Sequence, residues 1–306
     1  MDYKHIPIMF DQVMEGLNIN PGGVYFDLTV GGAGHSEGIA KRLENGKLFC
    51  LDRDPDAVKT AKQRLSQYSN VLVIQSVYNN IDIISKENDV DKVDGILMDL
   101  GVSSFQLDTC ERGFSYLHNG PLDMRMGKEG MTAAQLISSV EHKELTRILR
   151  YYGDERFAAN IARGILQENK KSPITTTEQL AKIVANNVPA KFKKEKNPCK
   201  RTFQALRIAV NDEINILDET IKKCFDLLNK SGRMAIITFH SIEDKLVQSH
   251  FKSWVKGCIC PREFPICVCG NVPKAKYISR LILPSEQEQE NNRRSKSAKL
   301  RIIERI

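Results

Sequence analysis

Short apolar runs alternate with amphipathic segments in the N-terminal part of the chain. The run from Val24 to Val30 is rich in β-branched and aromatic residues, and a cluster of small residues follows it at 31–36. Residues 37–43 then carry apolar side chains at helical spacing. This order predicts a strand, a tight turn and a helix. Three more strands are predicted at Lys47–Leu51, Val71–Gln75 and Val93–Asp99.

The pattern changes to helices without strands from about Thr109. Three helices are predicted, at Ala133–Tyr152, Glu155–Asn169 and Glu178–Asn187. Capping boxes are expected at Thr132…Gln135 and Thr175…Glu178. A long helix with apolar positions from Phe203 to Leu228 follows. Three further strands are predicted at Met234–Phe239, Tyr277–Leu283 and Ala298–Ile303, with a mobile loop at Ser285–Lys296 before the last of them.

The predicted fold class is α/β, a Rossmann-like sheet with an inserted all-helical domain. Strands that alternate with helices form a parallel sheet with helices on both faces. The expected divisions are residues 1–108 for the first part of the sheet domain, 109–204 for the helical insertion and 205–306 for the second part.

Composition is that of an ordinary globular protein. The chain has 306 residues, 41% of them hydrophobic, and a formal net charge of +7. This size allows a large core and one or two domains, and the positive charge is compatible with a polyanionic partner. No apolar stretch has the length of a membrane span, and none near Met1 resembles a signal peptide, so we expect a cytoplasmic protein.

The small residues of the first turn leave room for backbone N–H groups to approach a ligand at a helix N-terminus. A dinucleotide fingerprint would place a third glycine at Glu37, so a nicotinamide-dependent oxidoreductase is the least favoured enzyme class. Asp27 followed by small residues at alternate positions is more typical of the first motif of S-adenosylmethionine (SAM) methyltransferases, although Thr29 replaces a common glycine. A tight turn without a ligand is the alternative.

Asp27, Asp52 and Asp99 each fall at the carboxyl end of a predicted strand, where parallel sheets bind ligands. Asp52 follows the glycine turn by about 20 residues, the position from which an acidic residue binds ribose hydroxyls. Asp54 is expected to cap the helix that Pro55 begins. Helix capping is the alternative for any single one of these carboxylates.

Two more side chains fall near the same edge of the sheet. Tyr78 follows the third strand and is placed to flank adenine, with packing as the alternative. His240 ends the fifth strand, where a substrate contact and a structural role are both open. Ser241…Asp244 fits a capping box, which gives Asp244 a structural role.

Basic residues cluster at the end of the helical region and near the C-terminus. They are Lys191, Lys193, Lys194, Lys196, Lys200 and Arg201, followed much later by Arg293 and Arg294. We expect them to contact a phosphate backbone, and a solvated charged face is the alternative.

Four of the eight cysteines form two C-x-C pairs, Cys258/Cys260 and Cys267/Cys269. Four thiolates can hold zinc tetrahedrally, but the usual spacing between paired ligands is longer. We therefore expect reduced thiols or reversible disulfides and no metal, with structural zinc as the alternative. Catalytic zinc is not expected because four cysteines leave no open coordination position.

Ten motifs are distributed along nearly the whole chain: His5-Ile6-Pro7, Asp27–Ser36, Leu51–Pro55, Asp94–Ser104, Gln106–Asp108, Arg112–Ser115, Pro121–Met126, Tyr152–Arg156, Arg201–Ile208 and Phe239–Asp244. In these motifs the chain resembles the RsmH (MraW) family of bacterial 16S rRNA cytosine-N4 methyltransferases. The resemblance implies a SAM-dependent methyltransferase sheet with a helical substrate domain. It also implies a cytidine of the decoding region in the small (30S) ribosomal subunit as the methyl acceptor.

The resemblance further implies roles for individual residues. The SAM contacts would be Ala33, Gly34, His35, Asp52, Tyr78, Asp99 and Gln106. Asp99, with Ser103 or Ser104, would contact the cytosine amine, and the basic residues above would bind the flanking RNA. Ala33 departs from the glycine that is frequent in the family, and we expect little effect because alanine is also small.

Two other functions stay open. A DNA cytosine-N4 or adenine-N6 methyltransferase would carry an Asp/Asn-Pro-Pro-aromatic loop, whereas this chain has Asp99-Leu100-Gly101-Val102 at that position. A non-catalytic RNA-binding assembly factor would not need three carboxylates at successive strand ends. The oligomeric state is not predicted.

Overall fold

The chain folds into two compact units. The computed structural model describes residues 7–193, 197–261, 264 and 266–306. Met1–Gly101 and Asn215–Ile306 make up the sheet unit, and Val102–Ile214 is the helical unit. The helical unit is thus longer at both ends than the predicted insertion at 109–204. Its first helix is α5 (Ser104–Asp108), and its last, α11 (Cys199–Asn211), packs against α7 (His142–Gly153).

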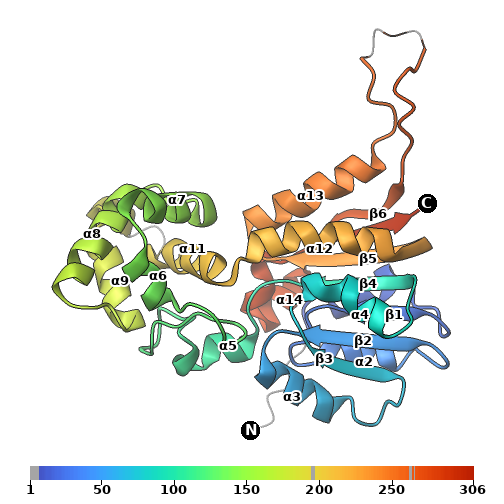
Figure 1. Ribbon diagram of the computed structural model, residues 1–306, viewed down its shortest axis with the longest axis horizontal. Helices are drawn as coiled ribbons and strands as arrows, with labels where there is room; N and C mark the ends of the chain where they lie inside the picture. The colour runs from blue at the N-terminus through green and yellow to red at the C-terminus, as the bar shows by residue number, and fades with distance from the viewer. Residues whose placement is uncertain (1–6, 194–196, 262–263, 265) are drawn as a thin grey trace. The chain divides into compact units, whose positions relative to one another are not determined.

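In the described residues, seven strands form one sheet in the order β3-β2-β1-β4-β5-β7-β6 (Figure 1). Their bounds are β1 Val24–Asp27, β2 Lys47–Asp52, β3 Val71–Gln75, β4 Val93–Asp99, β5 Leu228–Thr238, β6 Ala275–Ile282 and β7 Lys299–Arg305. The first five strands are parallel, and β7 runs antiparallel to β5 and β6. The α/β prediction is confirmed. The order of strands reverses between β1 and β4, which is where doubly wound sheets bind ligands.

Helices cover both faces of the sheet. The helical segments of the sheet unit are α1 Phe10–Leu17, α2 Gly34–Ala40, α3 Pro55–Arg64, η1 Tyr78–Asn80, α4 Ile81–Glu87, α12 Glu213–Leu227, α13 Ser241–Val255, α14 Glu286–Asn291 and η3 Arg293–Ser297, with α12 beginning in the helical unit. The predicted loop at Ser285–Lys296 is therefore wrong. Its charged sequence lacks apolar periodicity, but Ser285 Oγ caps α14 by accepting the Glu288 amide at 3.1 Å.

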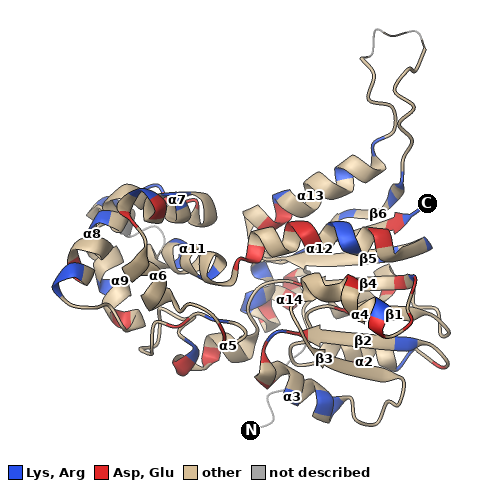
Figure 2. Ribbon diagram, in the orientation of Figure 1, with Lys and Arg blue, Asp and Glu red and all other residues tan. Residues whose placement is uncertain are grey.

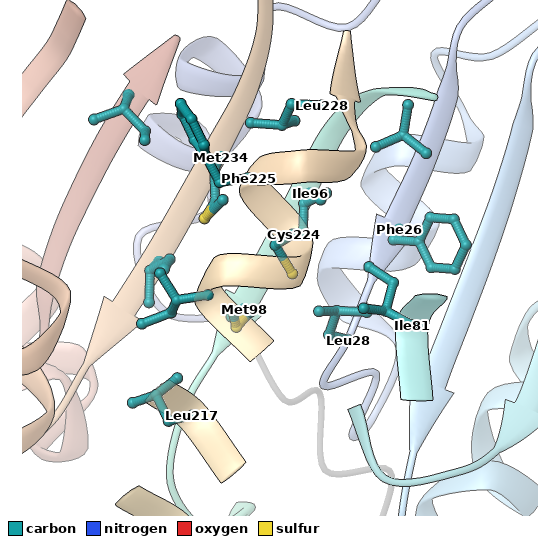
Figure 3. Packing of buried hydrophobic residues seen from close by; sticks show 14 of the residues in the cluster. Phe26, Leu28, Ile81, Ile96, Met98, Leu217, Cys224, Phe225, Leu228 and Met234 are labelled. Atoms are coloured by element: carbon teal, nitrogen blue, oxygen red, sulfur yellow. The ribbon is translucent and has the colours of Figure 1, made fainter. Parts of the chain in front are cut away.

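Each face of the sheet has its own hydrophobic core because successive strand residues point in opposite directions. Phe26 and Ile96 pack with residues of α4, α12 and α13. Their chain neighbours Tyr25 and Leu97 pack instead with residues of α1, α2 and α3. Figure 3 shows the first core, where side chains of β1 and β4 lie beneath α12. Burial on both faces holds the carboxyl ends of the central strands in fixed positions.

The helical unit is built from short helices around a third core. They are α5, η2 Cys110–Arg112, α6 Ala133–Ser139, α7, α8 Ala158–Lys171, α9 Thr177–Asn186, α10 Ala190–Lys193 and α11. One predicted helix, Ala133–Tyr152, is two helices, because the chain is extended at Val140. The predicted capping box at Thr132 is confirmed, whereas the second lies one residue later than predicted, at Thr176.

The predicted long helix from Phe203 to Leu228 is also wrong, because it breaks at Asp212. Asp212 adopts a left-handed conformation (φ 50°), so α11 ends there and α12 begins with Glu213. Arg207 spans the break with two 2.8 Å hydrogen bonds to the Glu213 carboxylate. Asn211 fixes the end of α11 by accepting the Met126 amide at 2.8 Å.

The loop around Arg112 and Gly113 is held by packing within this unit. The Arg112 guanidinium donates to the carbonyl oxygens of Arg125 and Met126, at 3.0 and 2.7 Å. Gly113 has φ 71°, and a side chain there would lie 2.2 Å from the Pro121 carbonyl oxygen. These contacts account for the residue types of the loop without a ligand.

Charged residues of both signs are interspersed over both units (Figure 2). No helix in the described part of the chain has the length and apolarity that a membrane crossing requires.

Candidate methyl-transfer site

Three carboxylates lie at the carboxyl ends of neighbouring strands, as predicted. Asp27 ends β1, Asp52 ends β2 and Asp99 ends β4. The Asp99 amide donates to Thr29 Oγ1 at 2.7 Å, which ties the end of β4 to the loop after β1. This role of Thr29 was not predicted from the sequence, and the unusual residue at a position where glycine is common was the available signal.

Asp27 accepts hydrogen bonds from both sides of the turn. It is buried, and its carboxylate accepts the Ser36 hydroxyl at 2.5 Å and the Thr29 amide at 3.1 Å. Burial raises the pKa of Asp27 to about 6, while the two hydrogen bonds oppose that rise. Both partners belong to the loop and to α2, so Asp27 fixes the backbone that a ligand would meet.

The turn itself is shaped for close approach. Gly31 has φ 47° and Ala33 has φ 61°, and a side chain placed at Gly32 would meet nothing within 4 Å. A side chain at Gly34 would instead lie 2.8 Å from the ring of Pro7. The turn is therefore open above Gly32 and closed at the start of α2.

Asp52 accepts hydrogen bonds from two backbone amides, one in the first turn and one just after β2. Its carboxylate accepts the Gly31 amide and the Asp54 amide, each at 2.9 Å. Burial raises its pKa to about 6, against the lowering effect of these two hydrogen bonds. The predicted capping role of Asp54 is confirmed, because its side chain accepts the Asp56 amide at 3.0 Å.

Asp99 has the most perturbed carboxylate of the three. Its Oδ1 atom is buried and accepts no hydrogen bond from the described residues. Burial raises the pKa of Asp99 to about 8, and the negative charges of Asp27 and Glu243 add to the rise. An acceptor atom without a donor, on a carboxylate of high proton affinity, is a typical feature of a functional site.

His35 lies beside Asp99. Its Nε2 atom is 3.0 Å from the Ile8 carbonyl oxygen, and since a carbonyl only accepts, Nε2 carries a proton. The other ring nitrogen, Nδ1, is then directed to the Asp99 side, 3.7 Å from Oδ2. The ring is buried and stacks on Phe10. These contacts fix which nitrogen of His35 faces the carboxylate.

Glu243 is a second group whose role was not predicted from the sequence. It is buried, and its carboxylate accepts the amides of Phe239 and His240 at 2.9 and 3.2 Å. The capping box of α13 is His240 with Glu243, so the prediction of Ser241…Asp244 was wrong by one residue. Histidine rarely serves as a cap, which hid the pattern. The cap gives His240 a structural role, whereas a substrate contact by this side chain stays a prediction.

The side chains predicted in other places are distributed over both units. Tyr78 begins η1 and packs against the first core. In the helical unit, Ser103 and Gln106 form the capping box of α5: Ser103 Oγ accepts the Gln106 amide at 3.2 Å, and Gln106 Oε1 accepts the Ser103 amide at 3.0 Å. Ser104 is the first residue of α5 and is half-buried.

The predicted nucleic-acid contacts differ in their surroundings. Lys191, Lys200 and Arg201 are exposed on the helical unit. Lys193 ends α10, and Lys194 and Lys196 lie outside the described residues. In the sheet unit, η3 carries the other two predicted cations, Arg293 and Arg294. Arg293 lines a hollow with Lys296 and the acidic residues Glu286 and Glu290. The environment of Arg293 is therefore of mixed charge.

The sheet unit offers the groups that SAM requires. The turn is open at Gly32, and Asp99 Oδ1 has no donor among the described residues. Asp52 is half-buried, and each of its carboxylate oxygens accepts one backbone amide and can accept a second hydrogen bond. Sulfonium and amino groups carry positive charge, which matches a carboxylate edge. The residues present therefore fit this cofactor.

Comparisons with known proteins agree with this fit. The profile of the MraW methylase family matches residues 2–306. A protein of Clostridium botulinum (strain Kyoto / Type A2) named ribosomal RNA small subunit methyltransferase H is 50% identical over 309 residues, covering 100% of both chains. Proteins of the same name from Carboxydothermus hydrogenoformans and Finegoldia magna are 46% and 45% identical, covering 100% of this chain and 99% and 100% of their own. The chain belongs to the MraW methylase family and is a methyltransferase whose donor is SAM.

Proposed function

We propose that this protein methylates the exocyclic N4 amine of a cytidine in the decoding region of 16S rRNA, within the small ribosomal subunit. The names of its relatives support a small-subunit rRNA substrate. The resemblance set out from the sequence motifs supports the N4 atom of cytidine. The observation that carries the proposal is Asp99, whose buried Oδ1 atom has no donor among the described residues. A ribosomal substrate also supports a cytoplasmic location.

The chemical difficulty lies in the acceptor. SAM supplies an electrophilic methyl group bound to a sulfonium centre. The N4 lone pair of cytosine is delocalised into the ring, so the amine is a weak nucleophile. The Asp99 carboxylate accepts a hydrogen bond from N4–H and aligns the amine for in-line attack. Such positioning supplies a large share of the rate acceleration in enzymes.

Asp99 also accepts the proton that N4 loses after methyl transfer. When N4 forms its bond to the methyl carbon, the bond between that carbon and sulfur breaks, and N4 becomes cationic. One N4 proton must then leave, and the nearby carboxylate accepts it. The raised pKa of about 8 describes the cofactor-free protein, in which Asp99 holds a proton at pH 7. The positive charge of bound SAM would favour the ionised form, and this carboxylate is then a stronger base than an ordinary one. His35 Nδ1, at 3.7 Å, lies within reach to share that proton.

The remaining groups of the sheet unit hold the cofactor in this proposal. Asp52 accepts hydrogen bonds from the ribose hydroxyls, and Tyr78 flanks the adenine ring. The turn with Ala33 and Gly34 faces the methionine end. From the helical unit we assign Gln106 to the cofactor and Ser103 or Ser104 to the N4 amine. Both Ser103 and Gln106 already serve as a helix cap, so their backbone geometry is fixed.

The RNA contacts are assigned to the basic residues. Lys191, Lys200 and Arg201 are exposed, and no ion pair joins them to another described residue. These side chains are therefore available to phosphates. We also assign Lys193, Lys194, Arg293 and Arg294 to the flanking RNA. The target cytosine must leave its stack to reach a buried carboxylate, so a single-stranded or distorted site is expected.

An acceptor comparison tests the proposal. Transfer of labelled methyl from SAM is measured with three acceptors: small subunits from cells that lack this protein, naked 16S rRNA, and duplex DNA. We expect label in the subunits and none in DNA. Label in DNA alone would support the DNA amino-methyltransferase instead. No label in any acceptor, with measurable SAM binding, would support a non-catalytic assembly factor.

A charge series tests the RNA surface separately. The variant with Lys191, Lys200 and Arg201 changed to alanine should bind RNA with a salt slope shallower by about 2, because each phosphate contact contributes about 0.7. Affinity for SAM should not change. Lys171→Ala is the matched control, since Lys171 is exposed on the same unit but is paired with Glu168 at 2.7 Å. An unchanged salt slope in the triple variant would show that this run is only a solvated face.

A further inference from the structure

An extended arm lies between α13 and β6 and comprises the described residues of 256–274 (Figure 1). Two contacts close the base of the arm. The Lys274 amide donates to the Trp254 carbonyl oxygen at 2.7 Å, and the Asn271 side-chain amide donates to the carbonyl oxygens of Lys256 and Gly257 at 3.0 and 2.7 Å. The arm has two legs, an outgoing one that carries Cys258 and Cys260 and a returning one that carries Cys267 and Cys269. Hydrogen bonds of the backbone and of one asparagine hold the legs together at the base.

The two C-x-C pairs face each other within this arm. The sulfur atoms of Cys258, Cys260, Cys267 and Cys269 all lie within 4.8 Å of one another. The Sγ–Sγ distance is 3.6 Å between Cys267 and Cys269 and 3.7 Å between Cys258 and Cys269. A disulfide would bring two sulfur atoms to about 2.0 Å. The four thiols are thus gathered without being bonded in pairs.

The 3.6 and 3.7 Å separations match the edges of a metal-centred tetrahedron, and the other pairs of sulfur atoms lie within 4.8 Å. With Zn–S bonds of about 2.3 Å, the edge between two sulfur ligands is about 3.8 Å. We propose that the four cysteines of the arm bind one Zn²⁺ ion in a closed structural site, and this inference does not depend on the proposed function. Sequence spacing favours free thiols because C-x-C is short for zinc. In the structure, however, the two C-x-C pairs lie opposite each other, so that together they supply four sulfur ligands.

Backbone hydrogen bonds support the sulfur atoms as thiolates. The Ile259 amide, between the first two cysteines, donates to Cys269 Sγ at 3.4 Å. The Val268 amide, between the other two, donates to Cys260 Sγ at 3.3 Å. Each leg therefore donates an amide to a sulfur atom of the opposite leg. Thiolate is the form that binds metal, and N–H donors stabilise its charge.

The donor set selects the metal. Among the described residues of the arm there is no Asp, Glu or His, so the available ligands are soft sulfur atoms. A tetrahedral set of four thiolates is typical of zinc and unsuited to Mg²⁺ or Ca²⁺. An iron–sulfur cluster distributes its cysteines over several iron atoms, which requires wider separation of the sulfur atoms than this cluster has.

The arm needs such a centre because it has no apolar core of its own among the described residues. Its large apolar side chains in that part of the chain are all more than half exposed: Ile259, Phe264, Ile266, Val268 and Val272. Short segments that cannot bury a core are commonly stabilised by disulfides or by a structural metal. Because the four cysteines are free thiols in the structure, a metal is the group that would order the arm.

Metal content tests the proposal directly. The untagged full-length protein is purified under reducing conditions without chelator, and its metals are counted by mass spectrometry. We expect one zinc per chain, and less than one-tenth of that in Cys260→Ser and Cys269→Ser. Cys110→Ser is the matched control, because Cys110 is a free cysteine in η2 of the helical unit, and it should keep one zinc per chain.

A second measurement separates an ordering metal from an incidental one. Amide hydrogen exchange at Ile259 and Val268 should accelerate at least tenfold when zinc is removed by chelator, with unchanged exchange in β1 and β4. Several results would overturn the proposal: wild-type protein that takes up no zinc from ZnCl₂, a Cys269→Ser variant that keeps its zinc, iron in place of zinc, or exchange in the arm that is indifferent to the metal.

Discussion

Replacing Asp99 by asparagine is the most informative single change in the sheet unit. Asparagine keeps the size of the side chain and removes its charge. The hydrogen bond to Thr29 Oγ1 comes from the backbone amide of Asp99 and therefore survives the substitution. The change therefore isolates what the carboxylate contributes, both to methyl transfer and to the stability of the protein without cofactor.

The structure predicts that this change raises stability. The pKa of Asp99 is raised from 3.8 to about 8, first by burial and then by Asp27 and Glu243. Because one pKa unit equals about 1.4 kcal/mol, the folded protein at pH 7 takes up a proton at a cost of about 4 kcal/mol. The side chain is 25% exposed, and water screens part of that cost. We expect a gain of about 1–3 kcal/mol for Asp99→Asn at pH 7.

The raised pKa of Asp99 also predicts how the stability of the protein changes with pH. A carboxylate whose pKa is higher in the folded state stabilises most at low pH, and its contribution is lost as pH rises from about 4 to about 8. Wild type should therefore become less stable over that range, and Asp99→Asn should do so less steeply. Asp27 and Asp52 have pKa values raised to about 6 and act in the same direction in both proteins.

The free energy of unfolding is measured by urea denaturation of the cofactor-free protein between pH 5 and pH 8.5. The rate of methyl transfer is measured in parallel. Asp99→Asn should lose about 10²–10⁴ in kcat, the usual contribution of a positioned acid or base. Asp94→Asn is the control: Asp94 lies on the same strand and accepts the Val24 amide at 2.8 Å, so its replacement should cost stability and leave kcat unchanged. Full activity of Asp99→Asn, or a stability loss equal to that of Asp94→Asn, would refute the reasoning.

Three further changes have expected outcomes. Gly34→Ala would push a methyl group to 2.8 Å from the Pro7 ring and should cost about 1–3 kcal/mol with weaker SAM binding, as denaturation and calorimetry would show. Ala33→Gly relieves a left-handed residue (φ 61°) but loosens the unfolded chain, so stability should stay within about 1 kcal/mol of wild type, and a larger loss contradicts this. Asp244→Asn would leave the buried Arg301 without its carboxylate partner at 2.8 Å and should cost about 3–5 kcal/mol in denaturation, whereas a cost below about 1 kcal/mol would show that the pair is dispensable.

The architecture of the sheet was readable from the sequence because buried parallel strands are short apolar runs between amphipathic helices. The same reasoning located Asp27, Asp52 and Asp99 at strand ends. It failed at the start of α12, because apolar periodicity continues through Asp212 although the backbone there is left-handed. Periodicity shows which side of a helix is buried and not whether the helix is continuous. The end of the helical insertion was predicted at residue 204, whereas the helical unit extends to Ile214.

The proton affinity of Asp99 was not readable from the sequence. It is raised first by burial and then by Asp27 and Glu243, which come from separate elements and approach only in the fold. Likewise, sequence spacing alone argued against a metal at the cysteines, because the approach of Cys258 to Cys269 is set by the path of the arm. In both cases a distance that only the folded chain sets decides the question.

The central claim is that this protein transfers a methyl group to N4 of one cytidine in the small-subunit rRNA. Its most direct test is nucleoside analysis of small subunits, from cells lacking the protein, after incubation with the protein and labelled SAM. We expect all label in N4-methylated cytidine at a single position in the decoding region. Label in another nucleoside, or at many positions, would contradict the claim.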